Sequence, residues 1–158
     1  MAPVKHLLVD GPNILHAWAD LRALLKRDRG AARQELARRL GAIHDAESVR
    51  ITLVFDGAGP ELLVEGSAAQ RTFAVLQTPA GVTADDVIEQ LVGGAANPGA
   101  CWVATADQAE RRTITALGAM WVPPEELAAW AERAERRLTA QVDGLRRNNA
   151  QKWRGASP

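Results

Sequence analysis

The sequence predicts an α/β fold, a three-layer sandwich with a mostly parallel central sheet of about five strands and a long C-terminal helix. Short apolar segments, several rich in β-branched residues, alternate along the chain with segments of helical periodicity. Two of the apolar segments stop at an Asp-Gly pair, which is typical of a turn. After Pro123 and Pro124 the rest of the sequence is highly charged and helical in pattern. This alternation indicates a parallel sheet that helices cover on both faces.

The expected strands are short apolar segments that end at turns. The first, HLLV (6–9), stops at Asp10-Gly11-Pro12. The second, VRITLVF (49–55), is rich in β-branched residues and stops at Asp56-Gly57, after which a loop is expected over 57–66. The remaining strands are expected over 72–77, 101–105 and 119–122.

The expected helices are marked by capping residues and by apolar residues at helical spacing. Pro12 suits the first turn of a helix, where its missing N–H costs nothing, and this helix is expected to run to about residue 26. Thr83 can cap a helix that runs from 84 to about 92. The other helices are expected over 31–46, over 108–117, and from 123 to near 148.

Size and composition predict one ordinary globular domain. The chain has 158 residues, 47% hydrophobic and 24% charged, and we expect the domain over 1–150 and a loose tail over 151–158. The single cysteine, Cys101, excludes an internal disulfide, and its apolar neighbours predict burial. No apolar stretch approaches the roughly 18 residues that span a bilayer, and no signal-peptide pattern opens the chain. We therefore expect a cytoplasmic protein with no membrane partner.

The charges cancel overall but are unevenly distributed. The segment 22–39 holds seven basic and two acidic residues, 40–110 holds ten acidic and two basic, and 132–158 holds seven basic and three acidic. An acidic middle between basic flanks suits a metal site beside a track for a polyanion. The alternative is that the arginine-rich helices only present solvated faces.

Four aspartates are expected at one edge of the sheet. Asp10, Asp56 and Asp107 each follow a strand directly or closely, and Asp85 opens a helix. Ligands of parallel α/β sheets bind at the carboxyl ends of the strands, where the strand order reverses. The four carboxylates are therefore expected to converge there. Taken singly, each of them also suits a helix cap or a turn.

Converging carboxylates predict a cation. They repel one another and resist ionisation unless a positive charge holds them. Mg²⁺ or Mn²⁺ prefers oxygen ligands, and either can activate water and stabilise charge on a phosphoryl group. The sequence has no GxGxxG and no GxxxxGK[ST], so no nucleotide cofactor is expected, and it lacks the GxSxG elbow of a serine nucleophile. The three histidines have no metal-ligand spacing.

Four segments in order resemble the YacP-like NYN endoribonucleases of the PIN-like nuclease group. They are LLVDGPNIL (7–15), VFDG (54–57), TADDVIEQL (83–91) and VATAD (103–107), and the resemblance extends over roughly 5–138. It implies an NYN/PIN-like α/β sandwich with one or two Mg²⁺ or Mn²⁺ ions. It also implies cleavage of RNA, which in some members is associated with ribosomes.

The resemblance assigns roles by position. Asp10 would be a metal ligand, with Asn13 positioning a ligand or the scissile phosphate, and Asp85 would be a second ligand. Asp107 would bind metal through water, and Asp56 would belong to the acidic cluster. Two supporting residues are Thr105, which can bond a carboxylate or phosphate oxygen, and Asp86. Three departures from the family pattern are Pro12, where tyrosine is common, Asp86, where glutamate often follows the aspartate, and Gln108, where arginine is frequent in related nucleases.

An acidic site repels RNA, so basic residues are needed on either side of it to hold the phosphate backbone. The expected RNA-binding residues are Arg33, Arg38, Arg39, Arg71, Arg111 and Arg112. The expected partner is single-stranded RNA such as mRNA, with the ribosome as a further partner. Two alternatives stay open: a nuclease or phosphatase that acts on DNA or small phosphoesters, and an RNA- or ribosome-binding module with a weak or inactive site.

Overall fold

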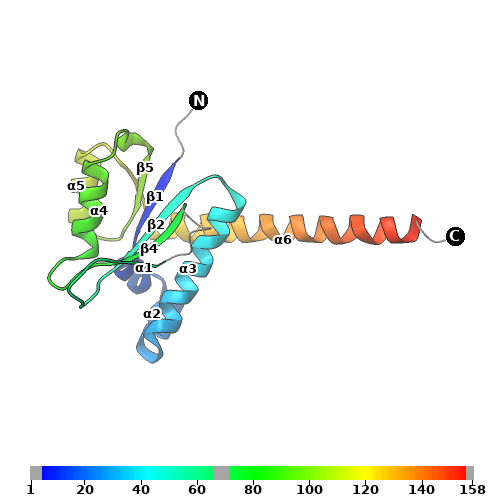
Figure 1. The fold of residues 1–158 in the computed structure, drawn as a ribbon, viewed down its shortest axis with the longest axis horizontal. Coiled ribbons are helices and arrows are strands. Elements are labelled where there is room, and N and C mark those ends of the chain that lie inside the picture. The colour runs from blue at the N-terminus through cyan, green and yellow to red at the C-terminus, as the bar shows by residue number, and fades with distance from the viewer. Residues whose placement is uncertain (1–4, 66–71, 156–158) are drawn as a thin grey trace.

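A computed structural model describes residues 5–65 and 72–155 and shows a six-stranded sheet at the centre of the molecule (Figure 1). The strand order is β3-β4-β2-β1-β5-β6. All neighbouring strands are parallel except β3 and β4, which are antiparallel. The strands are β1 (His6–Asp10), β2 (Arg50–Phe55), β3 (Leu63–Glu65), β4 (Phe73–Gln77), β5 (Cys101–Ala104) and β6 (Met120–Val122).

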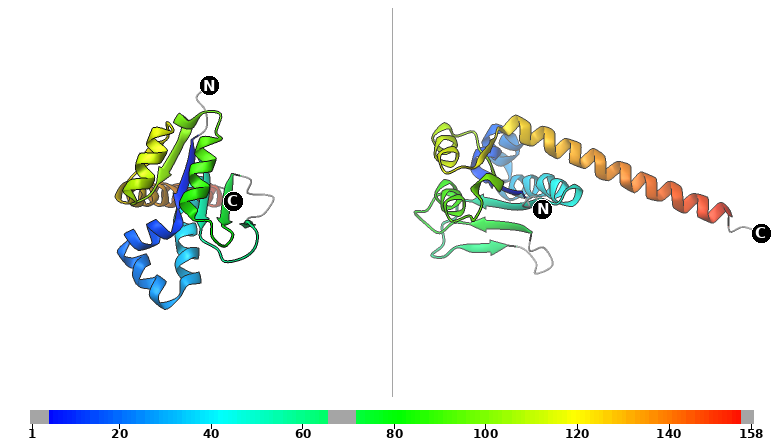
Figure 2. Two further views of the ribbon diagram at one scale, coloured as in Figure 1. Left: turned by 90° about the vertical axis from the view of Figure 1, so that its left-hand side faces the viewer. Right: turned by 90° about the horizontal axis from the view of Figure 1, so that it is seen from above.

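Helices cover both faces of the sheet, which confirms the three-layer sandwich (Figure 2). One layer consists of α1, α2, α3 and the first half of α6, and the opposite layer consists of α4 and α5. The helices are α1 (Gly11–Ala17), α2 (Ala19–Arg27), α3 (Arg29–Ala46), α4 (Ala84–Gly93), α5 (Gln108–Ala116) and α6 (Pro124–Gly155), with a 3-10 turn η1 (Pro98–Ala100).

The central strand β1 is apolar at successive positions because both of its faces are buried. Leu7 and Val9 face the layer of α1, α2, α3 and α6, whereas Leu8 faces α4 and α5. All three side chains are fully buried, because successive residues of a strand point to opposite faces and both faces are covered. Cys101 is also buried, as expected.

The single helix expected over 12–26 is wrong, because Trp18 divides it into α1 and α2. Its backbone is extended (φ −87°, ψ 117°), and its side chain is only 8% exposed. The indole N–H donates a hydrogen bond to the carbonyl of Pro124 (2.9 Å). A long-range contact with α6 thus overrides the local helical preference, and such a contact cannot be read from the neighbouring residues.

Two further boundaries differ from expectation. The loop expected over 57–66 contains β3, a short exposed edge strand that lacks the buried apolar alternation of the others. The last helix continues to Gly155 instead of ending near residue 148, so 151–155 are helical and not a loose tail. No proline interrupts that stretch. Residues 156–158 lie outside the described part. None of the helices in 5–65 and 72–155 is long and apolar enough to cross a membrane.

Candidate functional site

The candidate site lies where the strand order reverses. Strand β1 pairs with β2 on one side and with β5 on the other. The region at the carboxyl ends of these three strands, where sheets of this kind ordinarily bind ligands, is here called the crevice. Asp10 is the last residue of β1 and is only 3% exposed. Gly11 follows it because a Cβ at this position would lie 2.4 Å from the Phe55 ring. The glycine therefore lets α1 begin directly beside the end of β2.

Asp10 is held in place by the first turn of α1. Its Oδ1 accepts a hydrogen bond from the backbone N–H of Asn13 (3.2 Å), and its Oδ2 accepts one from Asn13 Nδ2 (3.3 Å). The burial of this carboxylate raises its pKa, although these hydrogen bonds oppose the shift. Asn13 therefore orients the Asp10 carboxylate through one backbone and one side-chain hydrogen bond.

The start of α4 carries Asp85 to the same crevice. Thr83 and Asp86 form a capping box, in which each side chain accepts from the other residue's backbone N–H (3.1 Å in both cases). The Asp56 carboxylate accepts from the N–H of Ala84 (2.7 Å), which ties the end of β2 to the helix. Asp56 and Asp86 thus use their carboxylates to fix α4, and Asp85 is left free.

Asp85 lies among other carboxylates. Its pKa is raised to about 7, first by burial, then by a hydrogen bond and repulsion from Glu89 and by repulsion from Asp10 and Asp107. Its Oδ1 is buried and has no hydrogen-bond partner among the described residues. The structure thus brings Asp85 into the electrostatic range of both Asp10 and Asp107, as the sequence predicts.

Asp107 and Thr105 connect β5 to α5. Asp107 caps the helix, because its Oδ1 accepts from the N–H groups of Ala109 (2.8 Å) and Glu110 (3.1 Å). The Thr105 hydroxyl accepts from the Asp107 N–H (3.0 Å) and donates to Glu110 Oε2 (2.7 Å). Thr105 is fully buried, and the carboxyl group that its hydroxyl bonds is that of Glu110.

Glu110 is the site residue that the sequence analysis missed. It is 1% exposed, although it lies in the first turn of α5. Burial and the adjacent Asp10 carboxylate together raise its pKa to about 10. An acidic residue in the first turn of a helix is ordinarily explained by its favourable interaction with the helix dipole. That explanation gives no reason to expect that the Glu110 side chain faces the interior. The signal in the sequence is its position three residues after the capping Asp107.

The buried carboxyl oxygens lack positive partners. Asp85 Oδ1 and Glu110 Oε1 accept no hydrogen bond within the described residues. Two ionised carboxylates cannot hydrogen-bond each other, so Glu110 and Asp10 need either a shared proton or a cation between them. This donor set of oxygens fits a hard divalent cation.

The positions of the side chains limit how such a cation is held. In the described part of the chain no three His, Cys, Asp or Glu side chains are arranged as a ready-made metal-binding group. Mg²⁺ commonly binds through one or two carboxylates and keeps several waters, which is compatible with this arrangement. Asp10 and Asp85 would hold the ion directly, and Asp107 would do so through water.

Comparisons with known proteins identify the family. The family model of the YacP-like NYN domain matches residues 7–156 of this chain. The chain belongs to the YacP-like NYN domain family. The protein YacP of Bacillus subtilis (strain 168) is 32% identical over 140 residues, which cover 86% of this chain and 80% of that protein.

Solved structures of the family share the fold of this YacP-like NYN domain. The crystal structure of Rae1 (YacP) from Bacillus subtilis is 30% identical with a TM-score of 0.72, over 98% of this chain and 86% of that one. A mutant of the same protein gives a TM-score of 0.71 over 90% and 84%. The NYN fold is of the nuclease type, so the site of this YacP-like domain lies on a nuclease-like scaffold.

Two of the basic residues predicted to bind RNA in this YacP-like NYN domain, Arg33 and Arg111, lie near elements that carry the candidate site. Arg33 donates to the carbonyl of Asp56 (3.1 Å) and lies 4.6 Å over the Phe55 ring. Arg111 projects from α5 and lies 3.7 Å over the Trp121 ring, and Arg112 is an exposed neighbour on the same helix.

The other basic residues are placed differently. Arg38 forms ion pairs with Glu35 and Glu135 (2.8 and 2.7 Å), and Arg39 pairs with Asp20 and Glu35. These arginines connect α2, α3 and α6, and their binding to RNA stays a prediction. Arg71 lies outside the described residues.

Proposed function

We propose that this YacP-like NYN domain is a metal-dependent endoribonuclease that hydrolyses phosphodiester bonds of RNA. The observation that carries the proposal is the convergence of Asp10, Asp85 and Glu110 at the switch point of the sheet, with two buried carboxyl oxygens that lack a donor. Buried carboxylates of like charge are costly to maintain, and functional sites are where such groups concentrate. The family's nuclease-type fold supports the same assignment.

Each residue of the cluster has a part in the proposed reaction. A bound Mg²⁺ or Mn²⁺ would supply an activated water and would offset negative charge on the phosphoryl group. Asp10 and Asp85 would hold the ion, and Asp107 would contribute through water. Asn13 and Glu110 position Asp10 from its two sides. Asp56 contributes to the acidic cluster and fixes α4, which carries Asp85.

The substrate in this proposal is single-stranded RNA, such as mRNA on the ribosome. An acidic crevice repels a polyanion, so cationic side chains beside it are needed to hold the phosphates. Arg33 lies next to Asp56, and Arg111 and Arg112 project from the helix that Asp107 caps. Arg33 thus lies beside the end of β2, and Arg111 and Arg112 lie on the helix that follows β5.

Incubation of the purified protein with RNA and DNA oligonucleotides tests the proposal. With Mn²⁺ or Mg²⁺ we expect internal cleavage of RNA, and with EDTA we expect none. Asp10→Asn should abolish cleavage, whereas Asp86→Asn, the matched change in the capping box, should retain it. Full cleavage in EDTA would contradict the metal mechanism. Cleavage of DNA or of small phosphoesters instead of RNA would assign the site to the other enzyme class. RNA binding without cleavage, on ribosomes as well as on free RNA, would make the protein a binding module.

A further inference from the structure

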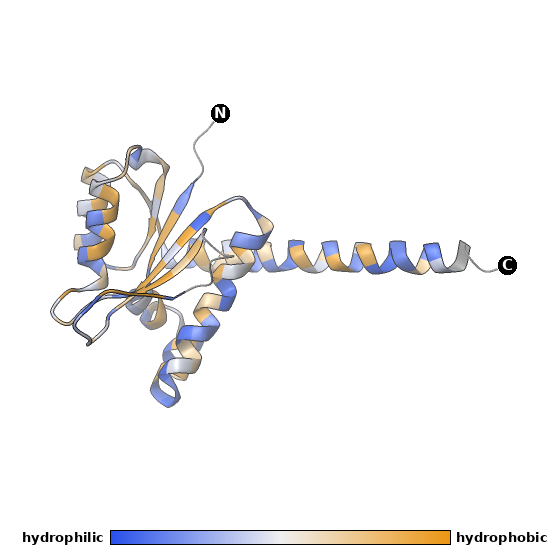
Figure 3. Ribbon diagram, in the orientation of Figure 1, coloured by the Kyte–Doolittle hydropathy of each residue, from blue (hydrophilic) through white to orange (hydrophobic). Residues whose placement is uncertain are grey.

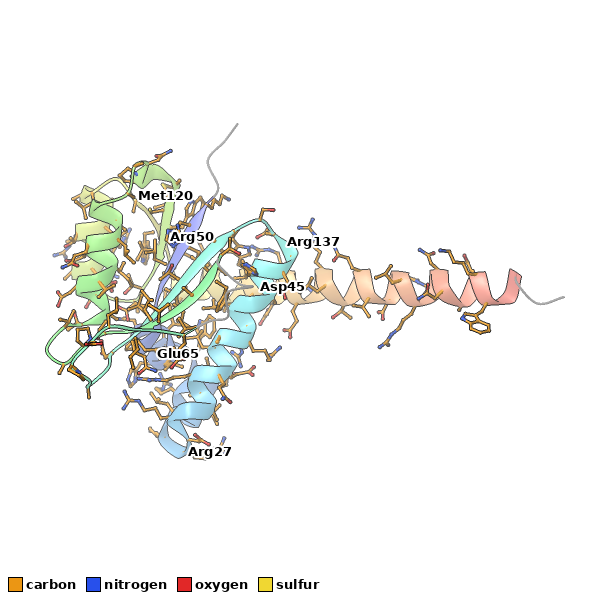
Figure 4. All side chains as sticks on the ribbon, viewed as in Figure 1. Arg27, Asp45, Arg50, Glu65, Met120 and Arg137 are labelled. Atoms are coloured by element: carbon orange, nitrogen blue, oxygen red, sulfur yellow. The ribbon has the colours of Figure 1, made fainter. Side chains whose placement is uncertain are left out.

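The second half of α6 extends away from the body of the molecule (Figure 1). The first half packs on the core through a stripe that includes Leu127, Ala131 and Ala134, with Leu138 at its margin. Residues 139–155, here called the α6 arm, continue the same helix beyond that contact. The arm side chains project into the space around it (Figure 4). The arm therefore lacks the tertiary packing that stabilises most helices.

The arm continues the apolar stripe of the packed half. Val142, Leu145 and Trp153 are exposed by 46%, 63% and 79%. From Leu138 they follow at intervals of four, three and eight residues, which keeps them on one side of the helix. Apolar and polar turns alternate along the arm in Figure 3. Gly144, in its middle, lowers the stability of an exposed helix by about 1 kcal/mol relative to alanine. A helix of this kind gains stability when a partner covers its stripe.

A groove on the same molecule has the features needed to receive the arm. It begins as a cavity of about 600 Å³ between α2, α3 and α6. Small apolar residues and Trp18 line it, together with the acidic residues Asp20, Glu125, Glu132 and Glu135 and the basic residues Arg38 and Arg39. A second cavity of about 410 Å³ shares Glu132 and Glu135 and continues along α6 to Asp143. Of the acidic residues of α6 along this groove, Glu135 is paired with Arg38, whereas Glu125, Glu132 and Asp143 form no ion pair within the described residues.

The dimensions and charges of the arm match those of the groove. The groove follows α6 from residue 125 to 143, roughly 28 Å of helix, and the arm is roughly 25 Å long. Arg146, Arg147 and Lys152 make the arm basic, against Asp143 alone. The unpaired groove residues Glu125 and Glu132 thus lie in the first half of α6, which also carries Arg133, Arg136 and Arg137, and the basic residues of the arm lie toward its end. In an antiparallel pair of such helices each basic end lies beside the Glu125 and Glu132 of the other copy.

We propose that the α6 arm of a second copy of this chain docks antiparallel into the groove, reciprocally, to form a two-fold dimer. Each arm then covers the groove of the other copy, as an isologous interface requires. The Trp153 ring is placed near Ala128 and Ala131, whose small side chains leave room for it. An RNA partner would satisfy the arginines of the arm but would leave Val142 and Leu145 in water, so the apolar stripe favours the second copy.

Light scattering coupled to size-exclusion chromatography tests the dimer over a range of protein concentrations. We expect a mass that rises from one chain toward two. Leu145→Glu combined with Trp153→Ala should weaken dimerisation at least about tenfold, because it removes the apolar anchors. Met120→Glu is the control, since Met120 is also a large exposed apolar residue (48%) but lies on β6, away from the arm. A monomeric parent at every concentration, or a double variant that dimerises like the parent, would overturn the proposal.

Charge reversal distinguishes this specific interface from non-specific self-association. Glu125→Lys with Glu132→Lys makes groove and arm both basic, whereas Arg146→Glu with Arg147→Glu makes both acidic. Each variant alone should be monomeric, and an equimolar mixture should form heterodimers that contain one copy of each. Adding Trp153→Ala to both variants should abolish the heterodimer. If the mixture stays monomeric, or if it still pairs after the loss of Trp153, the arm does not dock as proposed. A monomeric parent whose RNA affinity depends on Arg146 and Arg147 would assign the arm to RNA.

Discussion

Glu110 and Asp10 place two acidic side chains in one buried environment, with Thr105 donating to the first and Asn13 to the second. In the absence of metal the favoured state has one proton between them, held by Glu110, whose pKa is raised to about 10 by burial and by Asp10. Sequence reasoning found Asp10 because it ends a strand. It missed Glu110, because which side of α5 faces Asp10 depends on the packing of α5 against the sheet.

The first prediction concerns Glu110→Gln in metal-free protein. The pKa of Glu110 is higher in the folded state than in the unfolded state, so its carboxyl contributes stability that is complete below about pH 4.5 and is lost as the pH rises. Glutamine cannot ionise and can still accept from Thr105. The variant should therefore be more stable than the parent at pH 7, by on the order of 1 to 3 kcal/mol, and equal to it near pH 4. Denaturant titrations at several pH values measure the difference, and a pH-independent difference would contradict the assigned protonation state.

At the scale of the elements, several acidic residues fix helices as well as shape the site. Asp56 binds the start of α4, Asp86 completes a capping box, and Asp107 caps α5. The sequence predicted that Asp10, Asp56, Asp85 and Asp107 meet at one edge, because the ends of parallel strands share it. It could not distinguish a carboxylate that holds a neighbouring helix from one that is free, because the hydrogen bond from Ala84 to Asp56 joins segments 28 residues apart.

The second prediction tests the structural role of Asp56. Asp56→Ala removes the acceptor for the N–H of Ala84 and should lower the free energy of unfolding by about 1 kcal/mol. Asp56→Asn keeps an acceptor oxygen and should cost only a few tenths of that amount. Equal losses for the two variants, measured by urea unfolding, would show that the hydrogen bond is not what Asp56 contributes.

The third prediction concerns the junction of β1 and α1. A Cβ at position 11 would lie 2.4 Å from the Phe55 ring and 2.7 Å from the Val54 carbonyl, so Gly11→Ala should destabilise the protein by about 1 to 3 kcal/mol. Gly41→Ala is the matched control within α3, where a Cβ meets nothing within 4 Å. That control should be stabilising, by about 0.5 to 1 kcal/mol. Melting temperatures of both variants decide whether the close approach is real, and a neutral Gly11→Ala would refute it.

At the scale of the whole molecule, the sequence predicted the layers and the parallel sheet from the strand-helix alternation. It did not predict the break at Trp18 or the full length of α6, because the first depends on a contact with Pro124 and the second on the absence of any strong terminator. The fold also determines which of the basic side chains are paired with carboxylates. The Arg38 and Arg39 side chains pair with Glu35, Glu135 and Asp20, whereas Arg111 and Arg112 carry their charge beside the crevice.

The fourth prediction follows from that distribution. Arg111→Gln should weaken the binding of single-stranded RNA and reduce the slope of log affinity against log salt by about 0.7, the value for one phosphate contact. Arg38→Gln should reduce the slope less, because two carboxylates already offset the Arg38 charge. Fluorescence anisotropy with Asp10→Asn protein, which does not cleave, measures both slopes. A larger effect at Arg38 than at Arg111 would place the RNA along α3.

The most direct test of the metal site is the change in melting temperature caused by Mn²⁺. In the parent, Mn²⁺ at about one hundred times its dissociation constant should raise the melting temperature by roughly 5 to 10 °C, because the ion binds only the folded state. Asp86→Asn should keep this rise. Asp10→Asn and Asp85→Asn should lose it. Without metal, both variants should be at least as stable as the parent, since each removes a carboxylate whose pKa is raised in the folded protein. If both variants keep the parent's Mn²⁺ shift, the two aspartates do not form a metal site and the proposed mechanism is wrong.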